Sequence, residues 1–197
     1  DVGCTIGHNT LPWKETFSSA EVYGLDLAGP CLQYAHARAE AMNIKAHFRQ
    51  ASAQELPFND ESVDILFSSM FLHEMPVKEI RKFMDETFRV LKKGGVMIHM
   101  ELPPNDSLSP YDAFYLDWDS YYNNEPFYKT FRDLGYRDLC STAGFHEKSF
   151  FESVMPRFTY VSEEFFEAAV SADASFDENT GRLSDGIQWY GFGSRKD

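Results

Sequence analysis

The sequence opens with Asp1-Val2-Gly3-Cys4-Thr5-Ile6-Gly7, and a second informative stretch, Val22-Tyr23-Gly24-Leu25-Asp26, follows it. The first stretch is typical of a loop between a strand and a helix, where glycine lets the backbone approach a ligand closely. The second predicts a strand that ends on a carboxylate, 23 residues after Gly3. A carboxylate at this separation suits the two hydroxyls of a ribose, although a solvated strand end would read the same way. Together they favour an α/β fold with an adenosine site.

Strand-like and helix-like segments alternate along the chain, which is typical of a parallel sheet covered on both faces. The predicted strands are 21–27, 45–50, 63–69, 95–102, 148–155 and 188–194. The predicted helices are 30–42, 77–93, 127–143 and 163–172, with a polar loop over 173–185. No repeat or linker divides the sequence, so we expect one domain over residues 1–197.

Composition excludes several partners. The 18 basic and 31 acidic residues give a formal charge of −13, which disfavours nucleic acid and anionic membrane surfaces. No apolar stretch approaches the roughly 18–20 residues that span a bilayer, and the first residues lack a secretion signal. Three cysteines without a CxxC motif suggest neither a disulfide framework nor a zinc site. We expect a cytoplasmic protein without a metal ion.

Further segments follow in a fixed order: Gln50-Ala51-Ser52-Ala53-Gln54-Glu55-Leu56-Pro57-Phe58, Ser62-Val63-Asp64-Ile65-Leu66, Leu72-His73 and Arg89-Val90-Leu91-Lys92-Lys93-Gly94-Gly95. With the glycine loop and Asp26, this series resembles the class I S-adenosylmethionine-dependent methyltransferases, in particular the small-molecule type similar to ubiquinone/menaquinone-biosynthesis enzymes. The resemblance covers residues 1–102. It implies a Rossmann-like three-layer α/β/α sandwich with a mostly parallel, seven-stranded sheet. It also implies S-adenosylmethionine as cofactor and in-line methyl transfer to a small organic acceptor.

The resemblance also implies which residues bind the cofactor. Those expected around its methionine part are Asp1, Gly3, Cys4, Thr5 and the main chain at Ser68 or Ser69. On the adenosine side, Asp26 takes the ribose hydroxyls and Leu27 packs on the adenine face. Ser52 and Ala53 occupy the place where the family recognises the adenine edge.

Three departures from the family pattern bear on this site. Thr5 stands where a further glycine is usual, so a β-branched residue must allow the close approach. Ser52 replaces a frequent aspartate, which removes a charged acceptor for the adenine amino group. Of the first strand only Asp1-Val2 are present, so neighbouring strands would keep unpaired backbone groups. We therefore expect a longer natural protein, or a homodimer in which a second copy covers the gap.

The acceptor is expected beneath an aromatic-rich lid, residues 103–126, which follows the fourth predicted strand. Its rings are Tyr111, Phe114, Tyr115, Trp118, Tyr121 and Tyr122. We expect a substrate pocket formed by His73, Tyr111, Tyr115 and Trp118. The alternative is that these rings fill a local core or a dimer interface, since aromatic residues more often pack than take part in chemistry.

His73 is the candidate catalytic residue, because it follows the 63–69 strand on the side where open α/β sheets bind ligands. It could act as a general base or bind the acceptor, with Glu74 and Glu101 near enough to orient it or compete with it. A structural role in capping the next helix is the alternative. The segment Phe67-Ser68-Ser69-Met70-Phe71 lacks the Asp/Asn-Pro-Pro-Tyr/Phe element that resembles enzymes methylating exocyclic amines of DNA.

Two other functions fit the pattern less well. A nicotinamide-dependent oxidoreductase also combines a glycine loop with an acidic strand end, but its loop usually reads GxGxxG, whereas here Gly3 and Gly7 are four residues apart. A non-catalytic homologue that only binds the cofactor is favoured by Thr5, Ser52 and the short first strand.

Overall fold

The computed structural model describes residues 1–155 and 189–197. Its strands are β1 (Tyr23–Asp26), β2 (His47–Gln50), β3 (Val63–Ser69), β4 (Leu91–Glu101), β5 (Phe150–Met155) and β6 (Trp189–Arg195). Its α-helices are α1 (Thr10–Thr16), α2 (Gly29–Ala41), α3 (Val77–Val90), α4 (Pro110–Asn123), α5 (Tyr128–Arg132) and α6 (Tyr136–Thr142). Short 3₁₀ turns are η1 (Leu72–Glu74), η2 (Asn105–Ser107) and η3 (Glu147–Ser149).

The strands form a two-stranded sheet, β1-β2, and a four-stranded sheet in the order β3-β4-β6-β5. β1 pairs with β2, and β3 with β4, in parallel, whereas β6 runs antiparallel to both of its neighbours. The predicted α/β class is therefore confirmed, and the four-stranded sheet is mixed. The expected seven-stranded, mostly parallel sheet is not confirmed by the described residues.

Val2 joins the two sheets. It forms isolated parallel bridges with Leu25 of β1 and with Ser68 of β3. Its amide donates to the Phe67 carbonyl at 2.8 Å, and the Leu25 amide donates to the Asp1 carbonyl at 2.8 Å. Asp1 and Val2 thus pair with the adjacent residues of β1 and β3, as far as the short first strand reaches.

Helix α3 shows how sequence pattern and sheet pairing share control of the fold. Ile80, Phe83 and Met84 lie on one stripe and are fully buried, as the helical spacing predicts. The helix ends at Val90, three residues earlier than predicted, and β4 begins at once. The reason is tertiary: the Gly94 amide donates to the Lys196 carbonyl, and this pairing with the end of the chain extends the backbone.

The predicted helix 127–143 is wrong as a single element, because the structure divides it into α5 and α6. Gly135 precedes α6 in an extended conformation. Phe131 before the break and Tyr136 after it stack with ring centroids 5.1 Å apart, both buried in the main core. The break lets both rings reach that core, which a continuous helix would not do. The predictions for 163–172 and 173–185 lie outside the described residues. A helix was expected after the glycine loop without bounds, and α1 is that helix.

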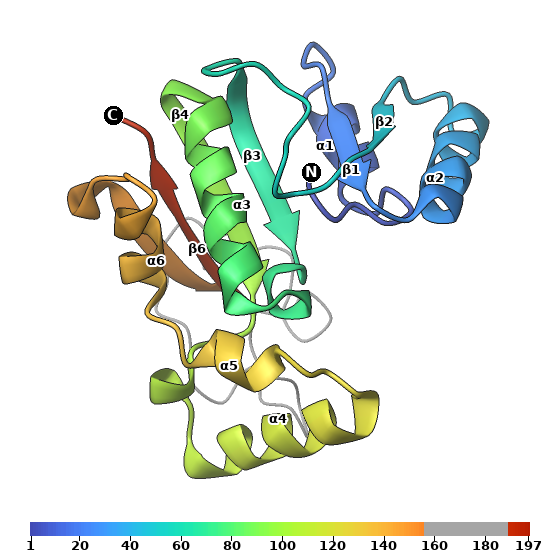
Figure 1. Cartoon of the computed structure of the whole chain (residues 1–197). Coiled ribbons are helices and arrows are strands. Elements are labelled where there is room, and N and C mark those ends of the chain that lie inside the picture. The colour runs from blue at the N-terminus through green and yellow to red at the C-terminus, as the bar shows by residue number, and fades with distance from the viewer. Residues whose placement is uncertain (156–188) are drawn as a thin grey trace, which may run out of the picture.

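Helices cover a face and one end of the sheet (Figure 1). α3 lies over the face formed by β3 and β4, whereas α4 and α5 lie beyond the carboxyl end of β3. A small second cluster joins α4 to this edge, and its buried members are Leu102, Leu116 and Tyr128. Among the described residues, no helix combines the length and apolarity needed to cross a membrane.

Candidate functional site

The backbone of the glycine loop packs tightly between β1 and β3. Gly3 has φ +72°, and a Cβ at this position would lie 2.3 Å from the Phe71 ring. The Gly3 and Cys4 amides both donate to the Leu25 carbonyl, at 2.8 and 3.0 Å. Thr5 has φ +45°, so this β-branched residue adopts a left-handed conformation that ordinarily costs about 1–2 kcal/mol. Thr5 thus takes the left-handed conformation that a glycine would adopt more easily.

Asp26 ties the glycine loop to the next helix. Its Oδ2 accepts a hydrogen bond from the Thr5 amide at 2.8 Å, and its Oδ1 accepts one from the Ala28 amide at 2.8 Å. A carboxylate offers about four acceptor positions, so each oxygen retains capacity for another donor. Leu27 beside it is 66% exposed. The end of β1 therefore presents a carboxylate and an apolar surface side by side.

Ser52 and Ala53 follow β2. The chain passes near Asp26 just before them, because the Ala51 amide donates to the Asp26 carbonyl at 3.1 Å. The Ser52 hydroxyl donates to Gln54 Oε1 at 2.5 Å and accepts from the Gln54 amide. Ala53 is buried. The structure brings this segment to the expected edge, with the Ser52 hydroxyl engaged within its own turn.

The residues expected near the methionine part of the cofactor differ in what they contact and in how deeply they are buried. Asp1 Oδ2 accepts a hydrogen bond from Thr10 Oγ1 at 2.6 Å, and burial raises the pKa of the Cys4 thiol to about 11. The Ser68 hydroxyl is fully buried and bonds His99 Nδ1 at 2.8 Å, so it faces the core. Ser69 ends β3 and is partly exposed. The Ser68 side chain is therefore engaged in the core.

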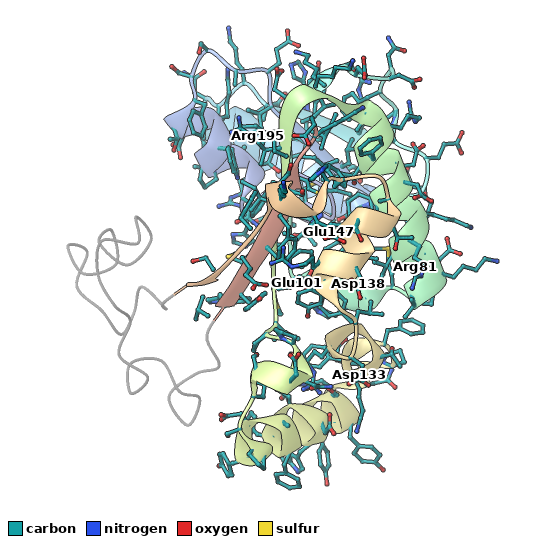
Figure 2. All side chains as sticks on the ribbon, turned by 90° about the vertical axis from the view of Figure 1, so that its left-hand side faces the viewer. Arg81, Glu101, Asp133, Asp138, Glu147 and Arg195 are labelled. Carbon is teal, nitrogen blue, oxygen red and sulfur yellow. The ribbon has the colours of Figure 1, made fainter. Side chains whose placement is uncertain are left out.

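Beyond this edge, a buried pair forms between His73 and Glu101. His73 Nδ1 lies 2.7 Å from Glu101 Oε2, while Glu101 Oε1 accepts from the Phe71 and Leu72 amides at 2.8 and 2.6 Å. Glu101 Oε2 acts as an acceptor toward the ring, so Nδ1 carries the proton and Nε2 the lone pair. Glu101, labelled in Figure 2, lies between the sheet and the α4–α5 region. Met70, with φ +49°, makes the turn that aims the two amides.

Opposing effects act on the pKa of His73. Burial lowers it, but the hydrogen bond and charge of Glu101, together with the charges of Glu74 and Glu125, outweigh burial and raise it above its ordinary value. His73 Nε2 lies 3.8 Å from Glu74 Oε1. The side chain is only 4% exposed. The ring is thus oriented on one side by Glu101 and faces carboxylates on the other.

The expected substrate pocket is only partly assembled. Among the described residues, the rings that pack against His73 come from α5: Tyr128, with centroids 5.0 Å apart, and Phe131, at 6.4 Å. Tyr115 is half-buried against the second cluster. Tyr111 and Trp118 are 64% and 47% exposed, and ring side chains project outward from α4 in Figure 2.

Sequence reasoning missed Tyr128, Phe131 and Glu125 as neighbours of His73. Tyr128 and Phe131 fall in the predicted helix 127–143, whose aromatic residues gave a packing signal but no position. Glu125 follows α4, and no motif or spacing in the sequence indicated that it would lie near His73. Glu101 was detectable as a carboxylate at a strand end, yet its direct pairing with His73 required the structure.

The geometry defines a class of protein. A glycine loop, a carboxylate at the end of the next strand and a buried histidine–carboxylate pair all lie at the carboxyl edge of parallel strands. This is the arrangement of a Rossmann-like, nucleotide-binding α/β protein.

Comparison with known proteins narrows the class. Residues 1–95 match a family model described as methyltransferase domain. Demethylmenaquinone methyltransferase of Thermus thermophilus is 34% identical over 104 residues, covering 53% of this chain and 46% of that protein. Erythromycin 3''-O-methyltransferase of Saccharopolyspora erythraea is 34% identical over 113 residues, covering 56% of this chain and 36% of that protein. The first half of the chain is thus similar to methyltransferases.

A solved structure agrees at the level of the fold. A SAM-dependent methyltransferase from Methanosarcina mazei superposes with a TM-score of 0.65 at 20% identity, covering 100% of this chain and 90% of that one. The chain spans less than half the length of the two curated relatives named above. The family match favours a methyltransferase over the oxidoreductase alternative.

Proposed function

We propose that this chain binds S-adenosylmethionine and catalyses transfer of its methyl group to a small organic acceptor. The observation that carries the proposal is the Asp26 carboxylate, which is hydrogen-bonded to the glycine loop at Thr5 and to the amide of Ala28 just before α2. Those bonds hold the carboxylate in place and leave acceptor capacity on both oxygens. Such a group is preorganised for a ribose diol, because its side chain loses little conformational entropy on binding.

The residues present fit the cofactor. Gly3 lets the loop backbone lie directly against the Phe71 ring, where a Cβ would collide, and exposed Leu27 offers a surface for the adenine ring. When bound, S-adenosylmethionine supplies an electrophilic methyl group on a sulfonium. In this proposal Asp26 accepts hydrogen bonds from the ribose hydroxyls. The methionine part lies along Asp1, Gly3, Cys4, Thr5 and the main chain at Ser68 and Ser69. Ser52 and Ala53 border the adenine edge.

His73 contacts the acceptor in this proposal. Its Nε2 carries the lone pair and takes the acceptor's proton, while Glu101 holds the proton on Nδ1 and stabilises the imidazolium that forms. Residues 103–126 form the lid. Half-buried Tyr115 packs at its base, and Tyr111 and Trp118 extend its aromatic surface outward.

A small acceptor is favoured over a nucleic acid by the formal charge of −13. The printed names of two relatives, demethylmenaquinone methyltransferase and erythromycin 3''-O-methyltransferase, refer to small molecules. We infer the same substrate class for this chain.

Calorimetric titration with S-adenosylmethionine, S-adenosylhomocysteine and NADPH tests the cofactor. We expect heat with the first two, and heat with NADPH alone would overturn the proposal. Asp26→Asn should weaken binding by about tenfold or more, since a charged acceptor is worth about 1.5–3 kcal/mol. Asp64→Asn is the matched control, because Asp64 lies near the opposite end of β3, is exposed and pairs with Lys92. Equal affinity of the two variants would remove Asp26 from the site.

A non-catalytic, cofactor-binding homologue is the second candidate, and the engaged Ser52 hydroxyl favours it. A methyl-release assay over phenols, quinols and carboxylic acids separates the two functions. Turnover of any acceptor that falls in His73→Asn would support the enzyme. Tight cofactor binding without turnover across the panel would support the second candidate.

A further inference from the structure

We propose that His73, Glu74 and Glu125 form a binding site for a divalent transition-metal ion at the carboxyl edge of the sheet. One ligand atom from each of these residues lies within 4.8 Å of the others. The inference goes beyond the proposed methyl transfer and does not depend on cofactor binding.

The separations are close to those around a bound ion. His73 Nε2 and Glu74 Oε1 are 3.8 Å apart. Ligands at about 2.1 Å from a tetrahedral ion stand roughly 3.4 Å from one another. The Glu74 side chain is 57% exposed and Glu125 is half-buried, so both carboxylates can turn inward without disturbing the core. Only small side-chain rotations separate this arrangement from a coordinating one.

Two segments distant in sequence converge to make this cluster. His73 and Glu74 lie on the turn η1, whereas Glu125 follows the end of α4. Asn124 ends that helix with φ +58°, and the Glu125 amide donates to the Ser120 carbonyl at 2.9 Å. Asparagine tolerates the left-handed conformation better than most residues. The direction in which Glu125 leaves the helix is therefore set by its own helix cap.

His73 is oriented as metal-binding histidines are. Its Nδ1 is paired with fully buried Glu101 at 2.7 Å, which leaves Nε2 to face Glu74 and Glu125. In the part of the chain that the structure describes, Nε2 has no hydrogen-bond partner, although the side chain is 96% buried. A carboxylate behind the distal nitrogen fixes the ring and raises its basicity as a ligand. The Nε2 lone pair is thus aimed at two carboxylates.

Electrostatics favours a cation at this place. Glu74, Glu101 and Glu125 surround one imidazole, and among the described residues none of these three forms an ion pair with lysine or arginine. Two other partly buried carboxylates are compensated by contrast: Glu86 pairs with Arg89, and Asp117 with Lys129 and Arg132. A divalent ion would compensate this cluster more completely than a proton on His73.

The donor set indicates the class of ion. One imidazole nitrogen and two carboxylate oxygens form a donor set that suits Zn²⁺ or Mn²⁺. Mg²⁺ prefers sites in which all ligands are oxygen atoms. Three protein ligands leave a position open for a small molecule. A hydroxyl bound there would lose its proton more readily, and Nε2 would then serve as a ligand in place of a base.

Titration calorimetry of the 197-residue chain with Zn²⁺ tests the site, and Co²⁺ absorption reports the coordination. We expect one ion per chain, with affinity lowered about tenfold or more in His73→Gln and in Glu125→Gln. His36→Gln is the matched control, since it removes the exposed His36–Glu40 pair, another place for weak zinc binding. The control should bind as the unaltered chain does.

Absence of binding at one equivalent, or unchanged affinity in His73→Gln, would overturn the inference. Equal binding of Mg²⁺ to the unaltered chain and to His73→Gln would show general attraction to carboxylates and would overturn it too. If circular dichroism shows that His73→Gln is unfolded, exposed Glu74→Gln decides instead, with the same expected loss. Titration with S-adenosylmethionine in the presence of a chelator separates failure of this site from failure of the proposed function.

Discussion

The glycine loop and the α4–α5 region meet at the same edge of the sheet, but they are held in different ways. Backbone groups position the loop: the Gly3 and Cys4 amides bond the Leu25 carbonyl, and the Thr5 amide bonds Asp26. Side chains position α4 and α5. Buried Arg132 bonds Asp117 at 2.6 Å and also Asn105, and its guanidinium lies over the Tyr128 ring.

This difference separates the two halves of the proposed site. The cofactor half is positioned by the ends of strands, which backbone hydrogen bonds hold in place. The acceptor half depends on a few side-chain contacts, with Arg132 central among them. We therefore expect the two halves to respond independently to substitution, because no residue of the Arg132 group contacts the glycine loop among the hydrogen bonds and ion pairs of the described residues.

The largest effect is expected at Arg132. Arg132→Ala removes a buried charged group and leaves Asp117 and Asn105 without it, which should lower the free energy of unfolding by about 3 kcal/mol. Urea unfolding measures this loss, and limited proteolysis should show faster cleavage within 103–126. Affinity for S-adenosylmethionine should stay unchanged in the folded fraction.

Lys129→Ala is the control for Arg132→Ala, because it removes an exposed partner of the same Asp117. It should change stability little, since exposed ion pairs contribute little. A large loss of cofactor affinity in Arg132→Ala would contradict the independence of the two halves.

An intermediate effect is expected at Gly3. In Gly3→Ala the new Cβ would lie 2.3 Å from the Phe71 ring, and the backbone would keep its φ of +72°. Steric overlap and left-handed strain together should cost about 2–3 kcal/mol and weaken cofactor binding. Differential scanning calorimetry and ligand titration measure the two effects.

Gly94→Ala isolates the backbone strain, because Gly94 has φ +79° with nothing within 4 Å of the added Cβ. Its cost should be about 1 kcal/mol, with cofactor affinity unchanged. Similar results for the two alanine variants would show that the space beside Gly3 is wider than the structure indicates.

The smallest effect concerns pH. Burial lowers the pKa of His99 to about 3, whereas an unfolded histidine titrates near about 6.5. Its contribution to stability is complete above about pH 6.5 and is lost as the pH falls toward 3, because the unfolded chain then binds the extra proton. Between pH 7 and pH 5 the loss should be about 2 kcal/mol.

Urea unfolding at both pH values measures this loss, and His99→Gln should flatten the difference. An identical pH dependence in the variant would assign the loss to other groups. His99 belongs to the sheet and bonds Ser68, so the titrating group lies on the cofactor side of the site.

Much of the first hundred residues was predictable, because local rules act there in agreement. The stripe of Ile80, Phe83 and Met84 predicted α3, and Asn43, with φ +55°, lies just beyond the end of α2 as a stop signal should. The glycine loop and Asp26 were placed correctly relative to each other. Those features arise from periodicity and strand order, which neighbouring residues largely determine.

The sequence by itself therefore determined the α/β class, the relation to methyltransferases and the meeting of the loop with Asp26. Only the tertiary structure decided where α3 ends, how 127–143 divides and which rings surround His73. Gly94 pairs with Lys196, 102 residues further along the chain, and Glu125 meets His73 from another element. The physical reason is that these positions depend on burial and on partners distant in sequence, whose free energies outweigh local preference and leave no periodic pattern.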